Sequence, residues 1–111
     1  MNRSDLDSRY LLVGLVCVGT LLLLVEAGLF DLYHEEPRRL LVSQSMLRES
    51  EWVVPHILGV PYWKKPPGYN WAVAGLSLIG GEVSRWSGRG VSILSWLTLG
   101  ALLFFGSRFL E

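Results

Sequence analysis

The sequence predicts an all-α membrane protein with three transmembrane helices and an outward-facing loop. Half of its 111 residues are hydrophobic, and they are gathered in long runs rather than spaced at the period of a soluble helix or strand. No charged residue occurs from Tyr10 to Val25 or from Val91 to Ser107. A bilayer core about 30 Å thick needs roughly 20 apolar residues in a helix, and both runs approach that length with their flanks.

The first span is predicted at residues 10–30, after a short N-terminal segment of residues 1–9. Arg3 and Arg9 precede the apolar run, so the positive-inside rule puts the N-terminus in the cytoplasm of a multi-pass protein of the inner or plasma membrane. A cleaved signal peptide is the alternative, because Val25 and Ala27 are small residues at a plausible cleavage spacing. The run is long for a signal core and further apolar segments follow, which favours an uncleaved anchor.

The second span is predicted at residues 66–81. Pro66 and Pro67 can open a helix, because their missing N–H groups fall where no intrahelical partner exists, and Gly80-Gly81 can end it. The segment is short for a span, so a re-entrant or interfacial position remains open.

A cytoplasmic turn at residues 82–90 and a third span at residues 91–107 complete this topology. Arg85 and Arg89 would then face the cytoplasm, in agreement with the positive-inside rule. A two-span hairpin is the alternative arrangement.

The outer loop, residues 31–65, is predicted to contain a juxtamembrane helix from Pro37 to about Glu49. Five basic residues would face outward, against the simple charge rule, and they are Arg38, Arg39, Arg48, Lys64 and Lys65. Anionic ligands are one explanation for this excess. The other is that five acidic residues of the same loop balance it.

Two charged clusters of this loop are candidates for chemistry. Glu35 and Glu36 precede the predicted helix, where carboxylates complement the helix dipole, although two adjacent carboxylates could also bind a metal or act as a base. Lys65 lies at the start of the second apolar segment. It could pair with a phosphate at headgroup depth, or it could simply extend its ammonium toward water.

Taken together, the clusters form an ordered pattern. The two carboxylates are followed by Trp52-Val53-Val54-Pro55, then Gly59-Val60-Pro61-Tyr62, and then Lys65-Pro66-Pro67 closing on Trp71. This pattern resembles the first loop of the polyprenyl-phosphate-sugar-dependent glycosyltransferases. These include the bacterial lipid A aminoarabinose transferases and, more distantly, the protein O-mannosyltransferases. Arg89 and Ser92 also fall where that family has an Arg-Leu-Pro-Ser-Ala turn, so the resemblance covers roughly residues 30–110.

The resemblance implies an N-terminal piece of a GT-C fold that transfers a sugar from a polyprenyl-phosphate donor to a lipid or protein acceptor on the outer face of the membrane. Glu35 would be the catalytic carboxylate with Glu36 beside it, and Arg38 and Lys65 would bind the donor phosphate. Glu35 replaces the family's usual Asp, which moves the carboxylate outward by about one methylene. Lys64 replaces a Glu that helps some members bind a divalent cation, so a divalent cation is a possible cofactor that this chain disfavours, and no metal ligand is assigned.

Other classes of function fit the composition less well. The formal net charge is zero and no basic stripe with interleaved aromatic residues is present, which excludes a typical nucleic-acid binder. A single cysteine, Cys17, cannot form an intramolecular disulfide. Three hypotheses follow: a truncated or split transferase, a small non-catalytic membrane interaction protein, and an anchor whose loop binds lipid phosphate. The expected partners are membrane lipids, the sugar donor, and the rest of the transferase or another membrane subunit; the isolated chain is expected to be inactive.

Overall fold

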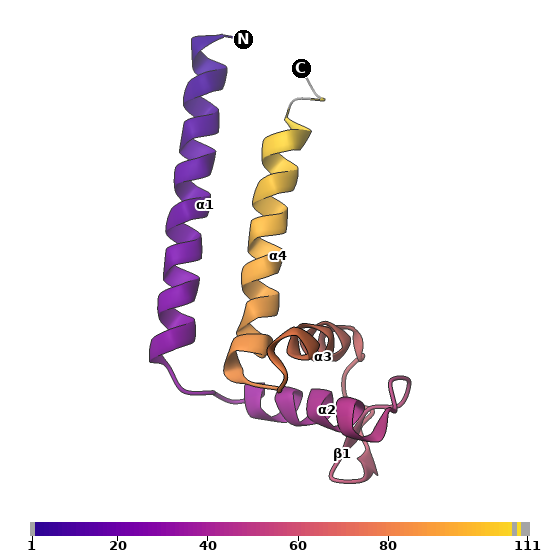
Figure 1. The fold of residues 1–111 in the computed structure, drawn as a ribbon. Helices are drawn as coiled ribbons and strands as arrows, with labels where there is room; N and C mark the ends of the chain where they lie inside the picture. The colour runs from indigo at the N-terminus through magenta and orange to yellow at the C-terminus, as the bar shows by residue number, and fades with distance from the viewer. Residues whose placement is uncertain (1, 108, 110–111) are drawn as a thin grey trace. The chain divides into compact units, whose positions relative to one another are not determined.

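The computed structural model describes residues 2–107 and 109, and the chain divides into two units. The first, here called the helix pair, contains the residues up to Leu29 and those from Ser92 onward. The second, the loop unit, runs from Phe30 to Val91. The elements are α1 (Arg3–Leu29), α2 (Glu36–Glu49), β1 (His56–Ile57), β2 (Val60–Pro61), α3 (Gly68–Gly80) and α4 (Arg85–Gly106), as Figure 1 shows. The start of α4 belongs to the loop unit and the rest to the helix pair.

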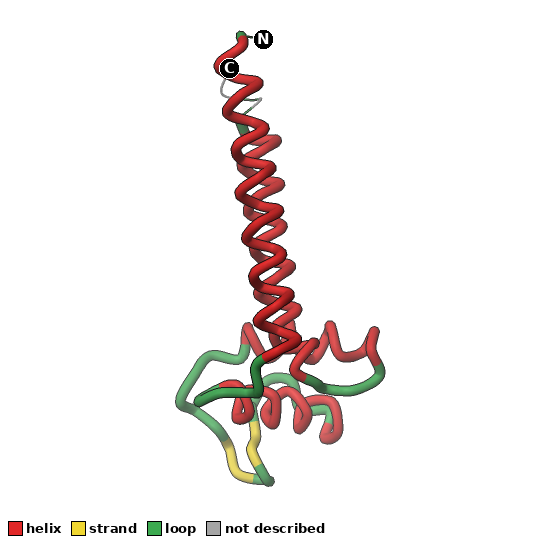
Figure 2. The backbone as a smooth tube through the Cα atoms, turned by 90° about the vertical axis from the view of Figure 1, so that its left-hand side faces the viewer, coloured by secondary structure: helices red, strands yellow, loops and turns green. Residues whose placement is uncertain are grey.

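In the helix pair, α1 and the body of α4 lie side by side and antiparallel (Figures 1 and 2). Glycine allows the close approach, because a Cβ atom at Gly19 would overlap the indole ring of Trp96, and one at Gly100 would lie 2.7 Å from a Val16 methyl carbon. The Trp96 indole N–H also donates a hydrogen bond to the Val16 carbonyl at 3.2 Å. Small residues and interhelical hydrogen bonds are the usual means of joining helices in lipid.

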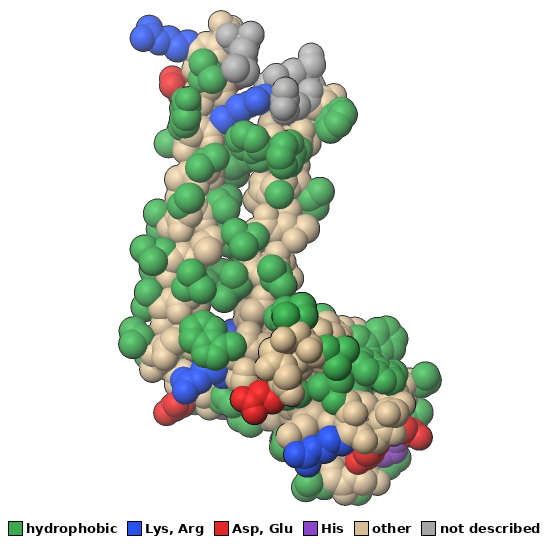
Figure 3. Space-filling model, in the orientation of Figure 1, with side chains coloured by type: hydrophobic (Ala, Val, Ile, Leu, Met, Phe, Trp, Pro, Cys, Tyr) green, Lys and Arg blue, Asp and Glu red, His purple; other side chains and the backbone are tan. Residues whose placement is uncertain are grey.

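Two helices, α1 and α4, are long and apolar enough to cross a membrane. With 27 and 22 residues, they extend over about 40 and 33 Å at 1.5 Å per residue. Apolar side chains are exposed along both of them, as the visible face in Figure 3 shows. In contrast, α3 has 13 residues and extends over only about 20 Å. The chain is therefore mostly helical with two candidate membrane-spanning helices, and the predicted set of three is not confirmed.

Both α1 and α4 begin before the uncharged runs from which they were predicted. The helix α1 begins at Arg3 instead of near Tyr10, and α4 begins at Arg85, inside the segment predicted to be a turn. Ser84 and Ser87 explain the early start of α4. Each backbone N–H donates to the other's hydroxyl oxygen, at 2.9 and 3.4 Å, in the reciprocal manner of a capping box. The predicted turn at residues 82–90 is thus wrong beyond its first residues.

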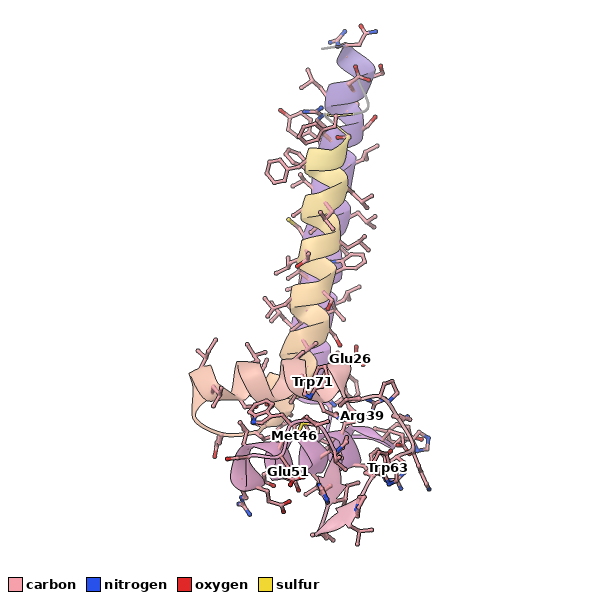
Figure 4. All side chains as sticks on the ribbon, turned by 90° about the vertical axis from the view of Figure 1, so that its right-hand side faces the viewer. Glu26, Arg39, Met46, Glu51, Trp63 and Trp71 are labelled. Carbon is pink, nitrogen blue, oxygen red and sulfur yellow. The ribbon has the colours of Figure 1, made fainter. Side chains whose placement is uncertain are left out.

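The loop unit is built on the packing of α2 against α3. The buried residues of α2 are Leu40, Val42, Ser43 and Met46, and those of α3 are Asn70, Val73, Ala74 and Ser77. The Met46 side chain lies between the two helices (Figure 4). Val42, Ser43 and Met46 of α2 and the four residues of α3 recur at spacings of three and four, as expected for residues on one buried helix face. The helix predicted from Pro37 to about Glu49 is confirmed.

A small β-hairpin connects these helices and was not predicted. The antiparallel strands β1 and β2 pair His56 with Pro61 and Ile57 with Val60. Leu58 and Gly59 form the two-residue turn, with φ angles of 51° and 80°. Positive φ at both positions is what the tightest hairpin turns require, and glycine adopts it easily whereas leucine does so rarely. The expected all-α fold therefore needs this correction.

Candidate functional site

Three of the predicted site residues converge at the start of α2. A carboxylate oxygen of Glu35 (Oε1) accepts a hydrogen bond from Arg38 Nη1 at 2.9 Å. Its other oxygen, Oε2, lies 3.6 Å from Lys65 Nζ, which comes from the separate segment just before α3. The three side chains remain between 38% and 49% exposed. The loop unit thus brings one carboxylate and two cations together at an open, water-accessible place, and these three residues are named the Glu35 cluster below.

Glu36 has a different set of partners, although it is the next residue. Its Oε1 accepts a hydrogen bond from Arg89 Nε at 3.1 Å, and its Oε2 accepts one from Arg89 Nη2 at 3.0 Å. Its Oε2 also accepts the backbone N–H of Tyr33 at 2.9 Å. The two-point contact matches the fork of a guanidinium with a carboxylate, which is the strongest geometry for such a pair.

Arg89 ties this segment together further. Its Nη1 donates to the Phe30 carbonyl at 2.6 Å, and its Nη2 donates to the Asp31 carbonyl at 2.9 Å. The Arg89 side chain is only 14% exposed, in contrast to 49% for Arg38. Arg89, Glu36 and the two carbonyl groups are called the Arg89 clamp. The clamp joins the second turn of α4 to the chain that leads into α2, and so fixes where α2 begins.

The clamp also sets the protonation of Glu36. The hydrogen bonds from Arg89 lower the pKa of the Glu36 carboxyl below its ordinary value. Partial burial opposes this shift of the pKa. The hydrogen bond from the Tyr33 N–H and the positive charge of Arg89 lower the pKa further. Glu36 is therefore held as a carboxylate. A carboxylate so engaged is a poor proton acceptor, because proton binding would cost it these contacts.

The interpretation of Glu35 and Glu36 as residues that stabilise the start of a helix is correct for one of them. Glu35 occupies the N-cap position of α2, but its side chain makes no capping hydrogen bond. Glu36, in the first turn, reaches back to the Tyr33 N–H and so satisfies a backbone donor ahead of the helix. Glu36 therefore stabilises the helix start, whereas Glu35 is directed to the cations of its cluster.

No metal centre accompanies these residues within the described part of the chain. Across residues 2–107 and 109, no group of three or more His, Cys, Asp or Glu side chains is arranged to hold a metal ion. A hollow in the loop unit lies where α3 ends and α4 begins, and Ser77, Ile79, Glu82 and Trp86 contribute to its lining. It includes none of the predicted site residues.

The sequence prediction missed the role of Arg89. Arg89 was matched to the family turn, but it was not proposed as a site residue or as the partner of Glu36. Nothing in the local sequence links positions 36 and 89, since the contact depends on the way the loop unit folds. The available clue was the spacing of Ser84 and Ser87, which is a helix start signal and places Arg89 near the beginning of α4.

Comparison with curated proteins finds relatives named undecaprenyl phosphate-alpha-4-amino-4-deoxy-L-arabinose arabinosyl transferase. The protein of Pseudomonas savastanoi pv. phaseolicola is 32% identical over 97 residues, which cover 80% of this chain and 18% of the relative. A relative of Pseudomonas fluorescens strain Pf0-1 is 31% identical over 97 residues, covering 81% and 17%. One of Pseudomonas aeruginosa strain LESB58 is 39% identical over 62 residues, covering 48% and 11%. No family model and no solved structure matches the chain.

The two apolar helices and these relatives identify a membrane protein that is related to part of a glycosyltransferase. More particularly, the chain is homologous to part of the undecaprenyl-phosphate aminoarabinose arabinosyl transferases, which confirms the family resemblance found in its sequence. The chain spans less than a fifth of the length of the relatives it matches.

Proposed function

We propose that this chain supplies the reacting carboxylate and the donor-phosphate contacts of a membrane glycosyltransferase that uses a polyprenyl-phosphate sugar. The observation that carries the proposal is the Glu35 cluster, where Glu35, Arg38 and Lys65 from two separate segments lie within ion-pair distance. The relatives' names include undecaprenyl phosphate and an amino-arabinose, which supports a donor of this chemical class. The acceptor in this proposal is a lipid or a protein.

The proposed reaction assigns one task to each charged group. Lys65 and Arg38 hold the phosphate that links sugar and lipid, and they stabilise the charge that this phosphate gains as the bond from the anomeric carbon to oxygen breaks. The acceptor oxygen forms the new bond to that carbon, and its proton passes to Glu35. The products are the glycosylated acceptor and the polyprenyl phosphate. Glu36 takes no proton in this scheme, because the Arg89 clamp holds it as a carboxylate.

The remaining walls of a donor site would come from further transferase helices, in the same polypeptide or in another membrane subunit. Ligand pockets bury most of a ligand's surface between several elements. The Glu35 cluster, by comparison, is open, and its side chains are up to about half exposed. This openness also favours the second candidate function, a non-catalytic membrane protein whose loop binds lipid phosphate. Both candidate functions require binding of a lipid phosphate, but only the first includes transfer of a sugar.

We further propose that the chain crosses the membrane twice, through α1 and α4, with the loop unit on the outer side and the N-terminus in the cytoplasm. The short α3 then stays on the outer side, since its roughly 20 Å cannot cover a hydrocarbon core about 30 Å thick. Arg3 and Arg9 give the orientation.

Single cysteines placed at Glu49 and Glu82, in a Cys17→Ser background, distinguish this topology from the three-span one. Both positions are exposed and lie on opposite sides of α3 in the sequence. Two crossings predict that a membrane-impermeant maleimide labels both from outside intact cells. Three crossings would protect the cysteine at position 82 until the cells are lysed. Protection of both positions would reverse the orientation.

Binding of a polyprenyl phosphate to the purified chain tests the phosphate contacts. We expect Lys65→Ala to weaken the binding of undecaprenyl phosphate in nanodiscs by about fivefold, the effect of one charge-assisted contact at a half-exposed site. Lys64→Ala is the matched control, since it removes the same charge from the neighbouring exposed position and should change the affinity less than about twofold. Equal losses in both variants would indicate attraction to the loop's general charge and no specific site.

A further inference from the structure

We propose that Glu35 acts as a built-in competitor for the donor phosphate, so that phosphate binding and release of the carboxylate are one coupled event. This inference rests on the function proposed above and adds a mode of regulation to it. In the structure, both cations assigned to the phosphate are engaged by the carboxylate assigned to the acceptor's proton.

The competition follows from the geometry of the carboxylate. Each Glu35 oxygen serves one cation: Oε1 accepts from Arg38 Nη1 at 2.9 Å, and Oε2 lies 3.6 Å from Lys65 Nζ. A phosphate oxygen seeks the same N–H donors as a carboxylate oxygen. The two anions also repel each other at contact distance. A phosphate that takes both cations therefore displaces Glu35 from them.

The Glu35 ion pairs are weak enough to be exchanged. All three side chains are between 38% and 49% exposed, and ion pairs this open to water contribute little to stability. The neighbouring Glu36 differs, because Arg89 holds it with two hydrogen bonds and is itself only 14% exposed. The adjacent carboxylates thus differ in role. Glu36 holds the start of α2 through Arg89, whereas Glu35 can release its two cations to a phosphate.

Exchange of partners gives the site an order of events. Without a donor, the cations neutralise Glu35 and hold it away from an acceptor's proton. When the donor phosphate binds, Arg38 and Lys65 turn to it and the carboxylate is freed beside it. The reactive carboxylate is then available only when a sugar donor is present.

The test is the affinity of the purified chain for undecaprenyl phosphate in nanodiscs. We expect Glu35→Gln and Glu35→Ala each to tighten binding by about three- to tenfold, because each removes the competing charge. Two substitutions are used because glutamine can donate to phosphate and alanine cannot. Glu49→Gln, an exposed charge at the far end of α2, is the matched control and should leave the affinity within about twofold. Amide hydrogen exchange of α2 verifies that each variant is folded.

The outcomes separate this inference from the proposed function. If Lys65→Ala weakens binding while Glu35→Ala leaves it unchanged or weaker, the competition is refuted and the phosphate site remains. A gain with glutamine but not with alanine also refutes it, since the amide would then be a new contact. If Lys65→Ala and Arg38→Ala both leave binding unchanged, the phosphate site itself is wrong and the competition falls with it.

Discussion

Transfer of the sugar should fall by a factor of about 10² to 10⁴ when Glu35 is replaced by glutamine, the usual range for loss of a general base. The measurement uses a chimaera in which this chain replaces the matched segment of the Pseudomonas savastanoi relative, since the chain spans only 18% of that protein. Glutamine has nearly the shape of glutamate but cannot accept the acceptor's proton. The loss should appear in the rate at saturating donor, while donor binding becomes tighter.

Two companion variants make this result specific. Glu35→Asp restores the carboxylate but withdraws it by about one methylene, on the order of 1 Å, and should recover part of the rate. Glu49→Gln, exposed at the end of α2, should transfer like the parent chimaera. Undiminished transfer by the Glu35→Gln chimaera would show that Glu35 is not the proton acceptor.

The second large effect is expected at the Arg89 clamp. Arg89→Met should lower the opening free energy of the start of α2 by about 2–3 kcal/mol, since Glu36 loses a two-point ion pair and two carbonyl groups lose their donor. Amide hydrogen exchange of the first two turns of α2 should accelerate roughly 30- to 150-fold. Arg48→Met, at the exposed last turn of α2, is the control and should alter exchange little.

Lowering the pH should also reduce the protection of α2 against hydrogen exchange. Because Arg89 lowers the Glu36 pKa, the pair stabilises the folded state fully above the ordinary carboxyl pKa of 4.5, and this contribution is lost as the pH falls through the lowered value. The same exchange measurement, followed downward from pH 6, should show the protection of α2 declining in the parent chain. In Arg89→Met this decline should be much smaller. An identical decline in both proteins would assign the acid sensitivity to another group.

The sequence was most informative where one local rule governs the structure. Pro37 and the acidic residues around it predicted the start of α2, and the uncharged runs from Tyr10 and Val91 predicted the two long helices. The resemblance named Glu35, Arg38 and Lys65 as site residues, and in the loop unit both cations lie within ion-pair distance of Glu35. Their chemical roles remain predictions.

The remaining features depend on contacts that local patterns do not encode. The hairpin turn at Leu58-Gly59 puts a leucine at positive φ, which its own preference disfavours. The apolar α3 reads as a short span, yet it packs its small and polar face, including Asn70 and Ser77, against α2. Arg89 lies far along the chain from Glu36, so only the folded loop unit identifies the pair.

The two halves of the helix pair flank the whole loop unit in the chain, which has a consequence for biosynthesis. The ribosome completes α1 first, and the Val16 carbonyl and the Gly19 surface then have no Trp96 to contact. The loop unit makes its internal contacts within Phe30–Val91, so it can fold before the rest of α4 has been translated. The contacts between α1 and α4 therefore cannot form until the rest of α4 has been translated, whereas those of the loop unit can form earlier.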